Sequence, residues 1–229
     1  PDNPVAYFYL GQEFYNRYET ATDPKEKQRD ADSADYAFNN SLIRKPDYIN
    51  PMICLAELQR STNKLDLAKT TYYRALRLAK TGDSASIFMG MGVVYAIKQQ
   101  LDSAGYFFRA ALKQNPKYPE GLSNYANFMD ITGQPDSALA YYAKAIAINP
   151  DNTIPYLNRA KILLKQNKVD EAIKNYTRVT ELKPDQGEAF LLRSKCYQQK
   201  GNRALALQDA DKAVALGYPV DKNYYQSLK

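Results

Sequence analysis

The chain has 229 residues, of which 45% are apolar, and it carries a formal net charge of +6 without any histidine. The lack of histidine argues against Ser-His and Cys-His nucleophile pairs, zinc-protease helices and most metal sites. We therefore expect no catalytic residue, no metal site, no cofactor and no activity as an enzyme. The richest apolar run, residues 138–148, is shorter than the ~18 residues of a membrane span, so we expect no membrane insertion.

The first segment, residues 4–48, is expected to hold a pair of helices separated by an insertion of about 11 residues within residues 19–33. Asp23 and Pro24 form a helix-start signal, because aspartate caps a helix and proline suits its first position. We interpret the insertion as a lengthening of both helices around a turn near residues 20–23. A charged, disordered loop is the alternative.

The rest of the chain repeats a pattern of large and small residues every 34 positions. Small residues form two columns: Gly92, Ala126, Ala160 and Ser194, and then Ala104, Ala138, Ala172 and Ala206. Large residues form two more, which are Phe88, Leu122, Tyr156 and Phe190, and then Phe108, Tyr142 and Tyr176 with Ala210 at the last place. Small residues let two helices approach closely while large ones fill the adjoining space, so the pattern predicts paired helices.

A proline closes most of these units. Pro116, Pro150 and Pro184 each follow the second predicted helix of a unit. Proline lacks the backbone donor and disfavours helical geometry in the residue before it, so each second helix should end there.

The 34-residue unit, with alternating large and small residues and a closing proline, resembles the tetratricopeptide repeat (TPR) family. The resemblance implies an all-α fold, a right-handed superhelical solenoid of about six helix-turn-helix repeats plus a short C-terminal capping helix. We expect one solenoid domain over residues 1–229. Its repeats are predicted at about 4–48, 49–84, 85–118, 119–152, 153–186 and 187–219, with the cap at 220–229.

The resemblance also implies a binding site, because in this family the first helix of each repeat lines a concave groove. The residues expected on that exposed inner face are Ser123, Asn124, Asn127, Leu157, Asn158, Lys161, Lys165, Leu191 and Lys195. The polar members, Asn124, Asn127, Asn158, Lys161, Lys165 and Lys195, are the candidate peptide-binding residues. Arg159 and Arg193, by contrast, are interpreted as packed stems with solvated heads.

Asn124 and Asn158 occupy equivalent places in successive repeats. An amide can donate to a peptide carbonyl and accept from a peptide N–H, so such residues can hold an extended chain without reading its side chains. The pair resembles the asparagine ladder of O-GlcNAc transferases, although Leu192 interrupts it. Lys161 and Lys195 also occupy equivalent places and would favour an acidic segment. The alternative is that the asparagines only bond neighbouring helices.

The positive charge is unevenly distributed along the chain. Residues 1–152 hold 17 basic and 17 acidic side chains, whereas residues 153–229 hold 14 and 8. This excess is interpreted as a solvated convex face, with a site for an acidic partner as the alternative. Nucleic acid is not an expected partner, since the related RNA-binding repeats usually have 35 residues and lack the closing Asn-Pro.

Two hypotheses about function follow. The first is a non-enzymatic scaffold that binds an extended peptide or partner protein in the groove. The second is an accessory TPR domain of a larger membrane-bound enzyme or envelope assembly, with its chemistry or anchor upstream of Pro1. The two cysteines, Cys54 and Cys196, lie four repeats apart and are expected to be free thiols.

Overall fold

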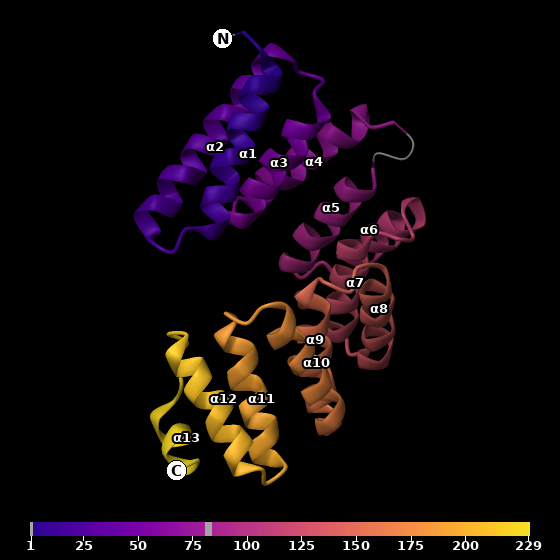
Figure 1. The fold of residues 1–229 in the computed structure, drawn as a ribbon. Coiled ribbons are helices and arrows are strands. Elements are labelled where there is room, and N and C mark those ends of the chain that lie inside the picture. The colour runs from indigo at the N-terminus through magenta and orange to yellow at the C-terminus, as the bar shows by residue number, and fades with distance from the viewer. Residues whose placement is uncertain (1, 81–83) are drawn as a thin grey trace. The chain divides into compact units, whose positions relative to one another are not determined.

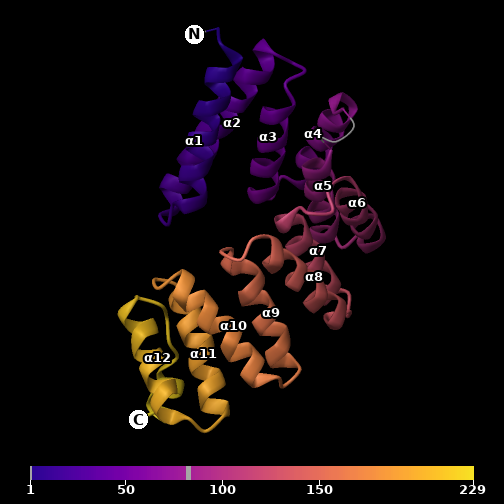
Figure 2. The ribbon, with the colours of Figure 1, turned by 45° about the vertical axis from the view of Figure 1, so that its right-hand side comes forward.

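The computed structural model describes residues 2–80 and 84–229, and the regular elements within these ranges are all α-helices. The first six are α1 (Pro4–Thr20), α2 (Pro24–Arg44), α3 (Ile49–Ser61), α4 (Leu65–Leu78), α5 (Ala85–Ile97) and α6 (Leu101–Gln114). The others are α7 (Pro119–Ile131), α8 (Pro135–Ile148), α9 (Thr153–Lys165), α10 (Val169–Leu182), α11 (Gly187–Gln199), α12 (Arg203–Ala215) and α13 (Lys222–Ser227). The expected all-α fold of helix-turn-helix units is confirmed (Figures 1 and 2).

The chain forms two compact units, Pro1–Pro116 with α1 to α6 and Lys117–Lys229 with α7 to α13. Within each unit, consecutive helices pair as hairpins, and each hairpin packs on the next. The single-domain assignment and the repeat limits stay predictions. The end of the second repeat, expected near residue 84, adjoins residues 81–83, which lie outside the described ranges.

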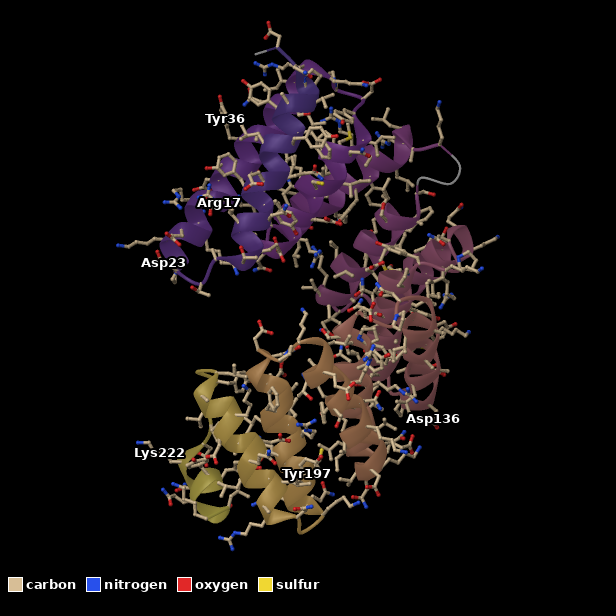
Figure 3. The ribbon with its side chains drawn as sticks, viewed as in Figure 1. Arg17, Asp23, Tyr36, Asp136, Tyr197 and Lys222 are labelled. Atoms are coloured by element: carbon tan, nitrogen blue, oxygen red, sulfur yellow. The ribbon has the colours of Figure 1, made fainter. Side chains whose placement is uncertain are left out.

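The insertion in the first repeat lengthens both of its helices. Helices α1 and α2 have 17 and 21 residues, against 13 and 14 in the pair α7 and α8. At the turn between α1 and α2, the Asp23 carboxylate accepts from the backbone N–H groups of Lys25 and Glu26 (Figure 3). The interpretation as longer helices is confirmed, and the alternative of a disordered loop is wrong.

The second helices end as the prolines predict. Helices α6, α8 and α10 end at Gln114, Ile148 and Leu182, each two residues before a proline. The intervening residue, such as Asn149 after α8, leaves helical geometry and caps the last turn with its backbone N–H.

The columns of small residues lie where two helices of a hairpin touch. The column members Ala126, Ala138 and Ala160 have no exposed surface. A methyl group added to Gly92 on α5 would lie 2.7 Å from the ring of Phe108 on α6. That distance is below van der Waals contact, so glycine is needed at this place because the ring fills the space a side chain would take.

A polar contact ties the end of one repeat's first helix to the preceding repeat. In each case the residue that follows the first helix of a repeat bonds an aspartate through its side chain. That aspartate lies in the first turn of the second helix of the preceding repeat. The pairs are Lys98 with Asp66, Gln166 with Asp136, and Lys200 with Asp170. The aspartates are also favoured there by the positive end of the helix dipole. Asp136 is visible at the start of α8 in Figure 3.

The C-terminal helix α13 covers the last repeat, as expected of a cap. Leu228, 2% exposed, packs with Ala206 and Ala210 of α12. The Tyr224 hydroxyl lies 2.6 Å from Ser194 Oγ, and Arg203 donates to the Leu228 carbonyl at 2.8 Å. The cap thus closes an apolar face that would otherwise be open to water.

Both cysteines are free thiols, which confirms the prediction. Burial raises the pKa of Cys54 to about 12 and that of Cys196 to about 11. Both thiols are therefore protonated at neutral pH, and neither is an activated nucleophile. Across residues 2–80 and 84–229, no helix combines the length and the apolar character that crossing a membrane requires.

Candidate peptide-binding face

The six candidate residues lie on the first helices of three successive hairpins of the second unit. Their side chains follow helical stripes, with Asn124 and Asn127 on α7, Asn158, Lys161 and Lys165 on α9, and Lys195 on α11. Spacings of three and four residues put side chains on one side of a helix. We call this set of six residues the asparagine face.

Two salt bridges join the stripes of the asparagine face. The Lys165 ammonium lies 3.2 Å from the Asp130 carboxylate on α7, and the Lys161 ammonium lies 2.9 Å from Glu188 on α11. Asp130 follows Asn127 by three residues on the α7 stripe. The structure thus links α7, α9 and α11 on the side where the candidate residues lie.

Exposure divides the asparagines into two kinds. Asn124 and Asn127 are exposed, and within the described ranges their amides form no hydrogen bond. Asn158 is half-buried, and its side chain lies near the hydroxyl of Tyr142 on α8. Burial raises the pKa of Tyr142 to about 12, and the nearby Asn158 amide acts against that rise. Asn158 therefore has a structural contact that Asn124 and Asn127 lack.

The contact between Asn158 and Tyr142 does not recur in the next repeat. Leu192 stands one repeat later, and the buried hydroxyl of Tyr176, the equivalent of Tyr142, has no partner among the described residues. An apolar side chain at residue 192 cannot offer the amide that Tyr142 receives.

We expect opposite effects from removing these two hydroxyls. Tyr142→Phe should lower the free energy of unfolding by ~0.5–1.5 kcal/mol because it removes the polar contact with Asn158, whereas Tyr176→Phe should leave it unchanged or raise it. Urea unfolding of the two variants beside wild type is the measurement. Equal losses in both variants would contradict the assigned contacts.

The lysines of the asparagine face are already engaged. Lys161 and Lys165 form the bridges described above, and the Lys195 ammonium lies 5.8 Å from the centre of the Tyr224 ring. Exposed pairs of this kind contribute ~0–1 kcal/mol and weaken with salt. An acidic ligand would have to compete with Glu188 and Asp130 for two of the three ammonium groups.

Three residues expected on the exposed face are buried instead. Ser123, Leu157 and Leu191 are 7%, 9% and 8% exposed, so their assignment to an open surface is wrong. The Ser123 hydroxyl donates to the Pro119 carbonyl within α7 at 3.0 Å. They lie four residues before Asn127, Lys161 and Lys195, so helical spacing puts them beside exposed side chains, and only the packing shows that they are covered. Ile131, which ends the α7 stripe with 63% of its surface exposed, is not among the residues that the sequence pattern indicated.

The interpretation of Arg193 as a residue with a solvated head is also wrong. Its Nε and Nη2 donate to the two carboxylate oxygens of Asp209 at 2.7 and 2.8 Å, and its Nη1 donates to the hydroxyls of Thr177 and Thr180. The Asp209 hydrogen bonds raise the pKa of Arg193 further. Thr177, Arg193 and Asp209 border a cavity of about 540 Å³, which Tyr197 of α11 also lines. Tyr197 is labelled in Figure 3.

Paired helices with a buried small-large core and an exposed polar stripe on successive first helices define a class of helical repeat proteins that bind through side chains on their surface. Three family models described as "Tetratricopeptide repeat" match residues 131–196, 107–140 and 55–119. The chain belongs to the tetratricopeptide repeat family, whose repeats typically mediate protein interactions.

Solved structures of similar fold span most of this chain. One is described as "YrrB: a TPR protein with an unusual peptide-binding site", with 27% identity, a TM-score of 0.59, and coverage of 83% of this chain and 96% of that one. PilF of Pseudomonas aeruginosa has 19% identity, a TM-score of 0.74, and coverage of 98% and 95%. A chain of the APC/C hetero-tetramer Cut9-Hcn1 has 15% identity and a TM-score of 0.80. The match covers 100% of this chain and 42% of that one.

A curated relative matches over a shorter stretch. The human protein O-mannosyl-transferase TMTC3 is 28% identical over 104 residues, which are 45% of this chain. The match spans 11% of the length of that relative.

Proposed function

We propose that this chain is a non-enzymatic scaffold that binds an extended peptide segment of a partner protein across the asparagine face. The observation that carries the proposal is the pair of exposed amides on α7, Asn124 and Asn127, which form no hydrogen bond within the described ranges. The likeness to YrrB, described as having a peptide-binding site, supports the same class of ligand.

The chemistry of these amides suits a peptide backbone. Each asparagine side chain offers an acceptor oxygen and two donor hydrogens, which match the N–H and C=O of one peptide unit. Ile131 lies on the same stripe and offers an exposed apolar contact beside them. A segment held this way is recognised mainly through its backbone, with one apolar side chain against Ile131.

The acidic preference should be modest. An acidic side chain gains Lys161 or Lys165 only by displacing Glu188 or Asp130, so one ion pair replaces another. The ammonium of Lys195 lies near the Tyr224 ring and takes no part in these two salt bridges. An acidic segment could therefore pair with Lys195 without displacing Glu188 or Asp130. Binding should therefore depend on the asparagines more than on the lysines.

This ordering predicts the outcome of two double variants. A peptide is first selected from a random displayed library against the wild-type chain, and its Kd is then measured by calorimetry. Asn124→Ala with Asn127→Ala should weaken binding about tenfold or more, because unmet backbone groups of the bound peptide are costly. Lys161→Ala with Lys195→Ala should weaken it less than tenfold, and only that loss should fade in ~0.5 M salt.

Asn158→Ala provides the structural control for this experiment. Its amide contacts the hydroxyl of Tyr142, so the substitution should lower stability as well as any affinity. If the peptide binds the Asn124→Ala, Asn127→Ala variant as tightly as wild type, its site lies elsewhere and the proposal fails.

The second candidate function is an accessory repeat domain of a larger membrane-bound enzyme or envelope assembly. The match to a short part of an O-mannosyl-transferase favours it, since there a similar stretch accompanies a much longer chain. The two candidates are compatible. Sequencing the full reading frame around this segment tests the second one, and a frame that ends close to both termini would rule it out.

A further inference from the structure

Two arginines 34 residues apart occupy the same place in successive repeats but have different surroundings. Arg193 on α11 is saturated, because Asp209 binds its Nε and Nη2 while Thr177 and Thr180 bind its Nη1. Arg159 on α9 is its equivalent. Within the described ranges, Arg159 forms no ion pair and no hydrogen bond through its side chain.

The sequence explains the difference partner by partner. At the place of Asp209 the earlier repeat has Asn175, and at the places of Thr177 and Thr180 it has Ala143 and Ile146. Asn175 is buried and directs its amide nitrogen to the Glu171 carbonyl of its own helix at 2.7 Å. The earlier repeat therefore lacks the carboxylate, and its Ala143 and Ile146 offer no side-chain acceptor.

The side chain of Arg159 lines a cavity. Its Nε is buried and unbonded among the described residues, and a cavity of about 320 Å³ is lined by Arg159 with Tyr156, Glu171, Lys174 and Asn175. In Arg193, Nε belongs to the edge of the guanidinium that the carboxylate of Asp209 occupies. The orphan in Arg159 is thus the donor that a carboxylate fills one repeat later.

The charge around the cavity favours an anion. Arg159 and Lys174 contribute two positive charges, and Glu171 contributes one negative charge. Arg178, which lies on α10, is already bridged to Asp151 and Glu181. Glu171 is exposed and forms no ion pair among the described residues, so it reduces the attraction without filling the site.

We propose that the cavity between α9 and α10 binds a carboxylate of a partner protein, through the guanidinium of Arg159 with Lys174 at the rim. The Asp209 carboxylate on Arg193 is the internal copy of that contact. The site differs from the asparagine face, because Arg159 and Tyr156 point about 100° or more away from Asn158 around α9. The partner's group is either an acidic side chain or a chain terminus.

Three capped pentapeptides serve as probes for the full chain at low salt. They are acetyl-Gly-Gly-Glu-Gly-Gly-amide, its glutamine counterpart, and acetyl-pentaglycine with a free carboxylate. The readout is the arginine Nε–Hε resonance in two-dimensional NMR, with Arg159 assigned through Arg159→Lys. We expect a saturable shift at Arg159 on the order of 1–10 mM for at least one carboxylate peptide. The stronger of the two carboxylate peptides identifies the source of the group.

The matched variant is Asn175→Asp, which supplies from within the chain the carboxylate that Asp209 supplies to Arg193. It should move the Arg159 resonance toward that of Arg193 and weaken peptide binding about tenfold, with no fall in melting temperature. Glu171→Gln, which removes the competing charge, should tighten binding. Asn124→Ala with Asn127→Ala should change nothing at Arg159, which separates this site from the asparagine face.

The proposal is overturned by a shift at Arg159 that does not saturate or that is equal for the glutamine peptide. It is also overturned if Arg193, whose edge is occupied, responds as strongly as Arg159. A third contrary outcome is an unchanged response in both Asn175→Asp and Glu171→Gln. An Arg159 response lost in Asn175→Asp and retained in the asparagine double variant supports it.

Discussion

Asp209→Ala is expected to lower the free energy of unfolding by about 3 kcal/mol, the low end of the range for breaking a buried ion pair. Asp209 is buried and Arg193 is partly buried, with side chains 7% and 15% exposed. Removing the carboxylate leaves the guanidinium without its counter-charge. The adjoining cavity of about 540 Å³ admits water, which is why we expect the low end. Denaturant unfolding of the full chain measures the loss.

The control for Asp209→Ala is Asp151→Ala, which breaks the bridge between Asp151 and Arg178 on the surface. Asp151 is 78% exposed and lies 3.4 Å from Arg178. Its loss should change stability by less than ~1 kcal/mol. Similar effects in the two variants would mean that burial does not determine the strength of the Arg193 pair.

The second large effect is expected from Ala138→Leu on α8. Ala138 has no exposed surface, and the column to which it belongs is alanine in each of the last four repeats. Three extra carbon atoms at this helix contact should lower the free energy of unfolding by ~1–3 kcal/mol through overpacking. The expected sign is a loss even though leucine is a good helix former, because packing outweighs propensity at a closed contact.

Ala147→Leu is the matched control, since Ala147 lies on the same helix but is exposed. It makes the same chemical change without a neighbour to displace, and stability should stay within ~0.5 kcal/mol of wild type. A melting temperature of Ala138→Leu equal to that of Ala147→Leu would show that the repeat register is wrong.

Much of the fold was predictable because its determinants recur along the chain. The small column that includes Ala126 and Ala160, and the prolines after α8 and α10, place helices and breaks at intervals of 34 residues. The lengthened first hairpin was predictable as well, since Asp23 and Pro24 start a helix by local chemistry alone.

For the candidate binding residues, the sequence predicted the position of each residue along its helix but not whether its side chain is exposed. Helical periodicity separated Asn124 and Asn127 from the core correctly, but it placed Ser123 and Leu157 on the open side. A step of one residue turns a side chain by 100°, and the width of the neighbouring helix decides whether that direction meets solvent or protein. Sequence spacing contains no information about that width.

What the sequence by itself determined is therefore the helical pairing, the breaks and the family, because each follows from residue types repeated at a fixed period. What only the tertiary structure decided is which polar groups are occupied. Arg193 and Arg159 stand at the same place in the repeat, and the residues that saturate one and not the other come from α10, α12 and their counterparts. Whether a hydrogen bond forms depends on differences of a few tenths of an ångström in the distance between side chains on different helices, and only packing sets those distances.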